Sequence, residues 1–460
     1  MAGWPDNCID NVVTDPPYNI GFMGKSWDNT GIAYNVDMWR EVLRILKPGA
    51  HLLAFGGSRT YHRMACAIED AGFEIRDMVE WIYGSGFPKS LDISKAIDKQ
   101  VGAEREVVGV RIYGDGKPCH FASDEAMRDS AGKCQSGETT HNLQTKPTTP
   151  AAVQWSGWGT ALKPAHEPVC LARKPISEKT IAENVLKWGT GGINVDGCRV
   201  GTNDKLNGGM TTGSTSASEG WDRPWRHNEE AVKSKIVRCK GQVAKSESLG
   251  RFPANLIHDG SDGVVEMFPQ TSTHFGTNTG YSGTSMFGLG GVGNSEKSSG
   301  SAARFFYCAK ASKAERDAGL EGEDERQMDE GRKEGNPGGD NPRNRGVNKR
   351  TNFHPTVKPI ALMKYLIGLI TPPPHVFGEN KIGGYGQTTP CVILDMFAGS
   401  GSTLVAAKLG GWRYIGIEIE KDYVAIAEKR LKEAEVEVKA VETGVPVAEQ
   451  KIGQGALFTP

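Results

Sequence analysis

Short apolar runs and amphipathic segments alternate through the first hundred residues. Apolar runs at 9–13, 51–55 and 73–81 predict buried strands. Between them, residues 36–46 place their apolar side chains on one helical face and end at a Pro-Gly pair, and residues 59–71 predict a second helix. Strand, helix, strand, helix and strand in this order are typical of βαβ units, so the pattern predicts an open α/β sheet.

The same alternation returns near the other end of the chain. Residues 391–395 predict a buried parallel strand, a glycine-rich turn follows, and residues 402–409 predict a helix. A strand at 412–418 and an amphipathic helix at 422–433 continue this βαβ pattern. Further upstream, residues 360–370 predict an apolar helix that a Thr-Pro-Pro-Pro segment ends.

The middle of the chain has little regular pattern. From 97 to 164 the periodicity fades and Gly, Ser, Thr, Lys and Pro dominate, which indicates an insertion. Apolar residues at 166–173 predict another strand of the same sheet, and Ser177 is predicted to cap a helix that ends before Gly189. Residues 201–301 are rich in Gly, Ser, Thr and Asn, which indicates long loops.

Composition narrows the class of protein. The 460 residues carry a formal net charge of −1, so no global positive field marks the chain as a nucleic-acid binder. The nine cysteines occur without a Cys-x-x-Cys pair, which predicts a reduced, cytoplasmic protein. No apolar run reaches the ~18 residues that a membrane helix needs. The spacing of Cys119, His120, Cys134 and His141 matches no familiar zinc finger, so no metal site is predicted.

The first candidate for chemistry follows the first strand, where Asp15, Pro16, Pro17 and Tyr18 form an acid-Pro-Pro-aromatic run. The Asp15 carboxylate accepts hydrogen bonds, and the prolines donate none, which leaves the Pro16 carbonyl as a second acceptor. Tyr18 offers a ring on which a flat base could stack. The run suits an exocyclic amino group; a tight strand-to-turn corner is the alternative. The polar loop at 19–35 is typical of a segment that closes over a ligand.

The second candidate is the glycine-rich turn after 391–395. The N-terminal amides of the helix at 402–409 can bind an anion. Glu418 ends the next strand about twenty residues later, where Rossmann-like units bind ribose hydroxyls. A Gly-x-Gly alone is a weak signal, but strand, turn, helix, strand and terminal acid together indicate a cofactor site.

A charged segment precedes the helix at 360–370. A short strand is predicted at 303–310, and residues 313–350 are rich in charge. Four basic residues gather near the end of this segment: Arg343, Arg345, Lys349 and Arg350. In a neutral protein such a loop is either a solvated linker or a contact for phosphates.

Three motifs together resemble the amino-group-specific DNA methyltransferases that use S-adenosyl-L-methionine, in the class whose catalytic motif precedes the cofactor motif. They are Thr14-Asp15-Pro16-Pro17-Tyr18, His354-Pro355-Thr356-Val357-Lys358-Pro359 and Asp395-Met396-Phe397-Ala398-Gly399-Ser400-Gly401-Ser402. The resemblance implies a circularly permuted, Rossmann-like sheet of seven strands with an inserted, loop-rich target-recognition region. It divides the chain into a catalytic half (1–96), an insertion (97–164), a core strand (165–175), a target-recognition region (176–350), a cofactor-binding half (351–435) and a C-terminal tail (436–460).

The resemblance also implies roles for individual residues. Asp15 and the Pro16 carbonyl would hold the target amino group, Pro17 would shape the turn, and Tyr18 would stack on the flipped base of duplex DNA. An Asp at the head of the motif resembles the adenine-specific branch, which implies transfer to adenine N6. The residues implied to bind the cofactor are Asp395, Phe397, Gly399, Ser400, Gly401, Ser402, Glu418, Thr356 and Lys358.

Several alternatives stay open at this point. The chain could methylate cytosine N4 or RNA, or it could be a DNA-binding relative without turnover. A homodimer and a cognate restriction endonuclease are the other partners that the resemblance suggests. Family members carry a strand with an acidic end before the catalytic strand, whereas this chain begins a few residues before Ile9. Either the start lies further upstream, or the sheet edge is missing or filled by another segment, such as 436–441.

Overall fold

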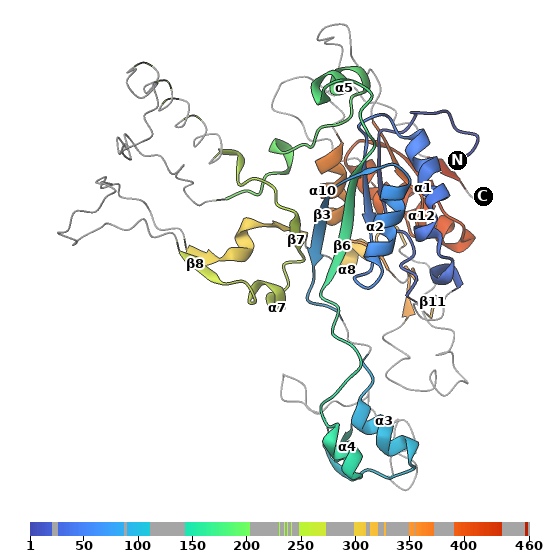
Figure 1. Cartoon of the computed structure of the whole chain (residues 1–460), viewed down its shortest axis with the longest axis vertical. Helices are drawn as coiled ribbons and strands as arrows, with labels where there is room; N and C mark the ends of the chain where they lie inside the picture. Colours follow the sequence, from blue (N-terminus) through green and yellow to red (C-terminus); the bar gives the residue numbers. More distant parts are fainter. Residues whose placement is uncertain are drawn as a thin grey trace, which may run out of the picture.

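A central β-sheet with helices on both faces organises the chain (Figure 1). The computed structural model describes residues 1–20, 26–86, 90–110, 143–202, 248–272, 299–309, 313–320, 326–327, 349–354, 356–371, 391–434 and 456–458, together with four single positions between 230 and 241. The sheet draws its strands from both ends and from the middle of the sequence.

Nine strands form this sheet within the described residues. They are β1 (Asn11–Thr14), β2 (His51–Phe55), β3 (Glu74–Ile82), β6 (His166–Arg173), β7 (Leu256–His258), β10 (Tyr307–Cys308), β13 (Val392–Asp395), β14 (Arg413–Ile417) and β15 (Ala456–Phe458). Their order is β10-β7-β3-β6-β2-β1-β13-β14-β15, and neighbours are parallel except that β6 runs antiparallel to β2 and β3. The pairing of β1 with β13 joins the two halves of the sequence.

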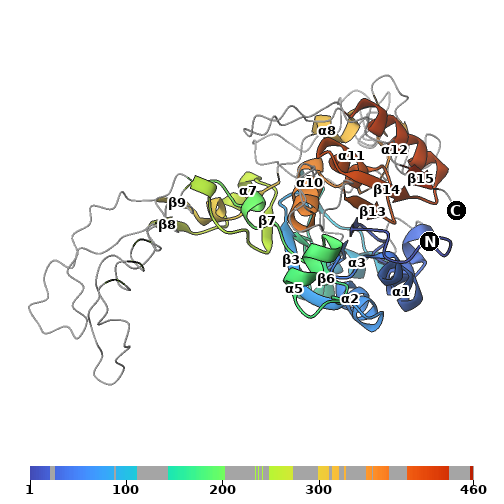
Figure 2. The ribbon, with the colours of Figure 1, turned by 90° about the horizontal axis from the view of Figure 1, so that it is seen from above.

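Two layers of helices cover the sheet (Figure 2). The helices are α1 (Val36–Ile45), α2 (Tyr61–Asp70), α10 (Ile360–Ile370), α11 (Ser402–Leu409) and α12 (Lys421–Glu433). Val12 and Leu52 pack with α1 and α2 in one apolar cluster, whereas Val13 and Leu53 pack with α10 and α11 in the other. Successive residues of a strand point to opposite faces, so fully apolar strands are what a sheet covered on both sides requires.

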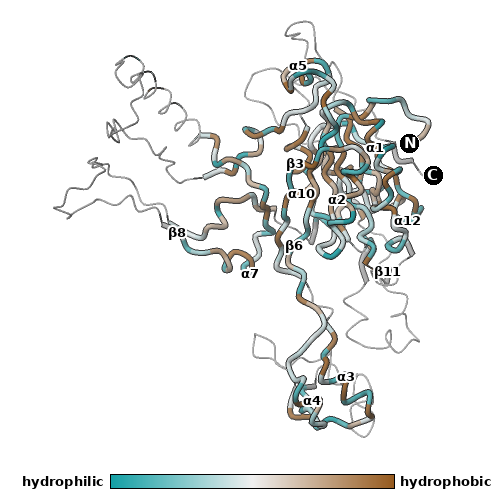
Figure 3. The backbone as a smooth tube through the Cα atoms, viewed as in Figure 1, coloured by the Kyte–Doolittle hydropathy of each residue, from teal (hydrophilic) through white to brown (hydrophobic). Residues whose placement is uncertain are grey.

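The α10 helix is apolar on nearly every side, and Figure 3 shows it among the hydrophobic segments of the core. It packs against α11 and β1, and the 3₁₀ turn at Asp196–Cys198 also contacts it. Burial on several sides explains why its sequence lacks the polar face of a surface helix.

Two smaller units extend from the sheet (Figure 1). One contains α3 (Ile93–Gln100), α4 (Pro150–Gln154) and the hairpin of β4 (Val107–Val110) with β5 (Leu143–Thr145). The other contains α7 (Asp262–Val265) and the hairpin of β8 (Gln270–Ser272) with β9 (Ser299–Ser301). In the first unit the buried Asp98 carboxylate pairs with Arg105 at 2.7 Å and accepts hydrogen bonds from Thr148 and Thr149. One saturated carboxylate therefore joins α3 to the segment before α4.

The structure confirms the α/β class and most of the predicted elements, and it corrects several details. The implied seven strands become nine, because β7 and β10 of the central region extend the sheet beside β3. The edge beside β14 is occupied by β15, while 436–441 lie outside the described residues. In the part of the chain that is described, no helix is long and apolar enough to span a membrane.

Two local predictions were wrong. Helix α5 (Ile181–Trp188) is capped by Thr180 rather than Ser177, because Thr180 and Glu183 form a reciprocal capping box. The strand expected at 303–310 is mainly a 3₁₀ helix, Ala302–Phe305, and only Tyr307–Cys308 pair with the sheet. The guanidinium groups of Arg251 and Arg304 lie 4.2 and 4.3 Å from the ring centre of Phe305, so cation–π contacts replace strand pairing there.

Candidate active site

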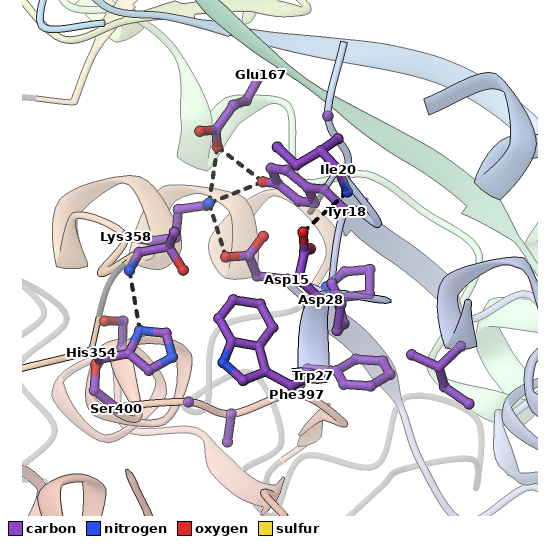
Figure 4. Close-up of a pocket in the computed structure, with 18 of the residues that line it drawn as sticks. Asp15, Tyr18, Ile20, Trp27, Asp28, Glu167, His354, Lys358, Phe397 and Ser400 are labelled. Carbon is purple, nitrogen blue, oxygen red and sulfur yellow. Dashed lines mark hydrogen bonds and ion pairs between the residues drawn. The ribbon is translucent and has the colours of Figure 1, made fainter. Parts of the chain in front are cut away.

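A cavity of about 1500 Å³ opens where β1, β13 and β14 end (Figure 4). Asp15 follows β1, the glycine turn follows β13, and Glu418 follows β14. Parallel strands bring their carboxyl ends to one edge of a sheet, where ligands of open α/β folds bind. The Thr14 hydroxyl donates to Asp395 Oδ1 at 2.7 Å across 381 residues of sequence, so the two motifs meet directly.

Four side chains form a polar cluster on one wall of this cavity, and we call Asp15, Tyr18, Glu167 and Lys358 the Lys358 cluster. The Lys358 ammonium lies 2.9 Å from Asp15 Oδ2, 2.9 Å from Glu167 Oε2 and 3.1 Å from the Tyr18 hydroxyl. The Tyr18 hydroxyl in turn donates to Glu167 Oε2 at 3.1 Å. Figure 4 shows the ammonium at the centre of the other three groups.

The charge state of this cluster follows from burial and pairing. Burial alone would lower the pKa of Lys358, but Asp15 and Glu167 outweigh it and raise that pKa, so the side chain stays cationic. Burial also raises the pKa of Asp15, and the nearby ammonium offsets part of that rise. Asp15 Oδ1 is buried and has no hydrogen-bond partner among the described residues, which leaves one acceptor oxygen for a ligand in the cavity.

The glycine turn is held by backbone hydrogen bonds to an acid. Glu418 accepts from the amides of Gly399 and Glu420 at 2.7 and 2.9 Å, which fixes the turn against the end of β14. Gly399 and Gly401 have φ of +51° and +79°, values that favour glycine. Gly399 lines the cavity, whereas Gly401 faces Ala427 of α12, where an added Cβ would lie 2.8 Å from the Ala427 Cβ.

A buried arginine that was not predicted from the sequence stabilises the same turn by hydrogen bonds. Arg430 of α12 donates to the Ser400 carbonyl at 2.6 Å and to the hydroxyls of Ser400 and Ser402 at 3.2 and 3.3 Å. Burial lowers its pKa to about 10, so it remains a cation at neutral pH. Its position beside Ile426, Ala427 and Leu431 on the buried face of the helix is the sequence signal that could have revealed it.

Two aromatic groups complete the cavity wall. Burial lowers the pKa of His354 to about 3, so its ring is neutral; Nδ1 accepts from the Thr356 amide at 3.4 Å, and the ring meets Tyr423 edge-on at 4.5 Å. Trp27 lies in the 3₁₀ turn Ser26–Asn29, and its indole N–H is buried with no partner among the described residues. Trp27 lies in the segment 19–35, which was predicted to be a loop that closes over a ligand, but the prediction did not name this residue.

The remaining predicted residues fall into three groups: some line the cavity, two lie in a separate hairpin, and the others lie outside the described chain. Phe397, Ser400, Ser402, Thr356 and the prolines of the first motif line the cavity. Lys349 and Arg350 form β12 and pair with β11 (Arg326–Gln327). Six residues lie outside the described ranges: Arg343, Arg345, Cys119, His120, Cys134 and His141. Within those ranges no group of His, Cys, Asp and Glu is arranged to hold a metal ion.

The fold and site define a class of protein: a Rossmann-like transferase whose acidic Pro-Pro corner and glycine turn share one cavity. The profile of the DNA methylase family matches residues 9–429. The chain therefore belongs to this family of N6/N4 amino-methylating DNA methyltransferases, which use S-adenosylmethionine.

Comparison with individual proteins gives partial matches. Type II methyltransferase M2.DpnII of Streptococcus pneumoniae is 44% identical over 86 residues, which are 19% of this chain and 26% of that protein. Type II methyltransferase M.HinfI of Haemophilus influenzae is 55% identical over 42 residues, 9% of this chain and 12% of that protein. The matches thus span about a quarter or less of these relatives.

Solved structures align over more of the chain at lower identity. The alignment with the crystal structure of the M1.HpyAVI-SAM complex covers 92% of this chain and 88% of the M1.HpyAVI chain, at 12% identity and a TM-score of 0.30. The alignment with the cytosine-N4-specific PvuII DNA methyltransferase covers 93% of this chain and 81% of the PvuII enzyme's chain, at 13% identity and a TM-score of 0.36.

Proposed function

We propose that this DNA methyltransferase acts on the N6 amino group of adenine in duplex DNA. The observation that carries the proposal is Asp15 Oδ1, a buried acceptor without a partner among the described residues, in the same cavity as the glycine turn. An amino group paired inside a duplex cannot reach this atom, so the target base must leave the stack. The Asp at the head of the motif resembles the adenine-specific branch of the family.

The cofactor half of the cavity suits S-adenosylmethionine. Asp395 and Glu418 place two carboxylates beside the turn, which fits the cofactor's ammonium group and its ribose hydroxyls. Phe397, Gly399 and Ser400 would shape the same half, with Ser402 and Thr356 close by, while Gly401 would act through packing on α12. When bound, the cofactor supplies a methyl group that its sulfonium makes electrophilic.

The other half of the cavity would hold the base. Asp15 Oδ1 and the Pro16 carbonyl accept hydrogen bonds from the amino group and draw its lone pair out of conjugation with the ring, which makes the nitrogen a better nucleophile. Tyr18 and Pro17 would bound the flat face of the base. Lys358, implied by the resemblance to contact the cofactor's methionine end, would instead act on Asp15, because its ammonium lies there.

We expect long-read modification mapping of DNA from cells that express the chain to reveal methyladenine at one short motif. An Asp15→Ala strain serves as the control and should show none. N4-methylcytosine at the motif would show that the target is cytosine N4 and not adenine N6. Modified RNA together with unmodified DNA would overturn the assignment of DNA as the substrate. Cofactor binding without any modification would favour a relative without turnover. The homodimer, the cognate endonuclease, cytoplasmic localisation and phosphate contacts by Arg343, Arg345, Lys349 and Arg350 remain predictions.

The Asp395 carboxyl predicts how cofactor binding depends on pH. Burial raises its pKa from 3.8 to about 6, although hydrogen bonds from Thr403 and Thr14 offset part of the rise. Its contribution to folding is therefore fully present below pH 3.8 and is lost as the pH rises through about 6. The affinity for the cationic cofactor changes with pH in the opposite direction and increases as Asp395 ionises, because only the carboxylate attracts an ammonium group.

We expect S-adenosylmethionine to bind roughly tenfold more weakly at about pH 5 than at about pH 8, as measured by calorimetry. In the Asp395→Asn variant the affinity should be lower at neutral pH and flat across this range. An affinity in the unmodified protein that does not change between these pH values would show that the charge of Asp395 does not contribute to binding.

A further inference from the structure

Glu167 is the one member of the Lys358 cluster that lies in no recognisable motif. It comes from β6, where it pairs with Trp81 of β3, and its side chain is 19% exposed. Its Oε2 atom both pairs with Lys358 and accepts from the Tyr18 hydroxyl. Two carboxylates and one ammonium give the cluster a net charge of −1 when all three are ionised.

We propose that Glu167 is a positioning residue that sets the net charge of the Lys358 cluster at −1, so that Lys358 orients Asp15 without neutralising it. The side of the cavity that this cluster forms is called the catalytic wall below. The inference rests on the proposed function, because it assigns Glu167 a role toward a cationic cofactor and a target amino group. It also assigns Lys358 to the catalytic wall of the cavity.

The geometry supports this division of roles. Lys358 is held in place, because its ammonium lies 5.4 Å from the ring centre of Tyr18 and 4.9 Å from that of Phe55 in addition to its two ion pairs. Asp15 uses Oδ2 for this ammonium and keeps Oδ1 for a ligand. If Asp15 were the sole carboxylate beside the ammonium, the pair would be neutral and the Asp15 oxygens would be weaker acceptors. Glu167 supplies the second negative charge.

The reaction requires negative charge on this wall. The amino nitrogen forms a bond to the methyl carbon while the bond from that carbon to sulfur breaks, and its electron pair stays on sulfur. The positive charge thus moves from sulfur to nitrogen, which then loses one proton to Asp15 Oδ1 and from there to water. A wall with a charge of −1 stabilises the cation before, during and after the transfer, and a neutral wall does not.

The test compares the cationic cofactor with S-adenosylhomocysteine, which lacks the methyl group and the sulfonium charge. Glu167→Gln should weaken S-adenosylmethionine binding roughly tenfold and leave S-adenosylhomocysteine binding unchanged, as measured by calorimetry on the full chain. The value of kcat/KM for the cofactor in methyl transfer should fall by at least the same factor. Glu69→Gln, an exposed glutamate on α2, is the matched control and should change neither.

A charge-preserving variant keeps the inference testable if Glu167→Gln is unstable. Glu167→Asp keeps the net charge of the cluster at −1, so the affinity ratio of the two ligands should stay that of the unmodified protein, and a changed ratio in this variant would contradict the inference. Equal loss of both ligands, or an unchanged ratio in Glu167→Gln, would overturn the inference. If the unmodified protein binds the cofactor but modifies no DNA, the proposed function fails while the affinity ratio still decides the role of Glu167.

Discussion

Replacing Asp15 by alanine is expected to lower methyl transfer at least about 10³-fold. The change removes a buried acceptor without a partner among the described residues from a side chain that lines the cavity, and it leaves the Lys358 ammonium with Glu167 as its remaining carboxylate partner. Affinity for S-adenosylhomocysteine should stay the same, because the glycine turn and Glu418 are untouched. Affinity for S-adenosylmethionine should fall by no more than roughly tenfold, since one negative charge is lost.

Single-turnover methylation and calorimetry measure the two effects separately. Asp15→Asn keeps an acceptor oxygen and loses the charge, so it separates hydrogen bonding from electrostatics; we expect it to be slow as well. Asp37→Ala is the control, because Asp37 is an exposed residue at the start of α1 that pairs with Arg40. Loss of S-adenosylhomocysteine binding together with transfer in Asp15→Ala would mean that Asp15 is structural.

The second large effect is expected from Gly399→Ala in the cofactor turn. An added Cβ would lie 2.6 Å from His354 Nε2, and the φ of +51° is unfavourable for alanine. The imidazole is part-buried, accepts a hydrogen bond from the Thr356 amide and packs edge-on against Tyr423, and these contacts oppose its displacement. We expect the free energy of unfolding to fall by about 2 to 4 kcal/mol and cofactor binding to be lost.

Chemical denaturation and calorimetry test this expectation against two further variants. Gly192→Ala should be neutral, because nothing lies within 4 Å of its added Cβ and its φ is outside the left-handed region. Adding His354→Ala to Gly399→Ala removes the clash and should recover part of the stability. Normal cofactor affinity in Gly399→Ala would refute the role of this turn.

Sequence periodicity was a reliable guide wherever one covered sheet set the pattern. The strand at 51–55 and the helices at 360–370 and 402–409 have the predicted bounds. Apolar strands and amphipathic helices must match the sheet they bury, so local sequence carries that information. The strand prediction at 303–310 was wrong, because the conformation around Phe305 depends on contacts with arginines from two segments, Arg251 and Arg304.

The two motifs of the cavity were also legible, because each needs particular residues at adjacent positions. The Asp15 corner and the turn at Gly399 lie at one cavity, as their order in a permuted sheet implied. Glu167 was not found, since a single acid at a strand end resembles an ordinary surface residue. Arg430 was missed although it lies on the apolar face of its helix, because an arginine in a charged helix is usually exposed. Trp27 likewise carries no local signal that separates it from a core tryptophan.

The sequence by itself determined the α/β class, the two chemical motifs and the family they resemble, because those features depend on residues close together in the chain. Only the tertiary structure decided that β1 lies beside β13, that Lys358 sits between Asp15 and Glu167, and that Arg430 supports the cofactor turn. The physical reason is that burial and the distance between charges fix how each group behaves, and both arise only when distant segments pack together.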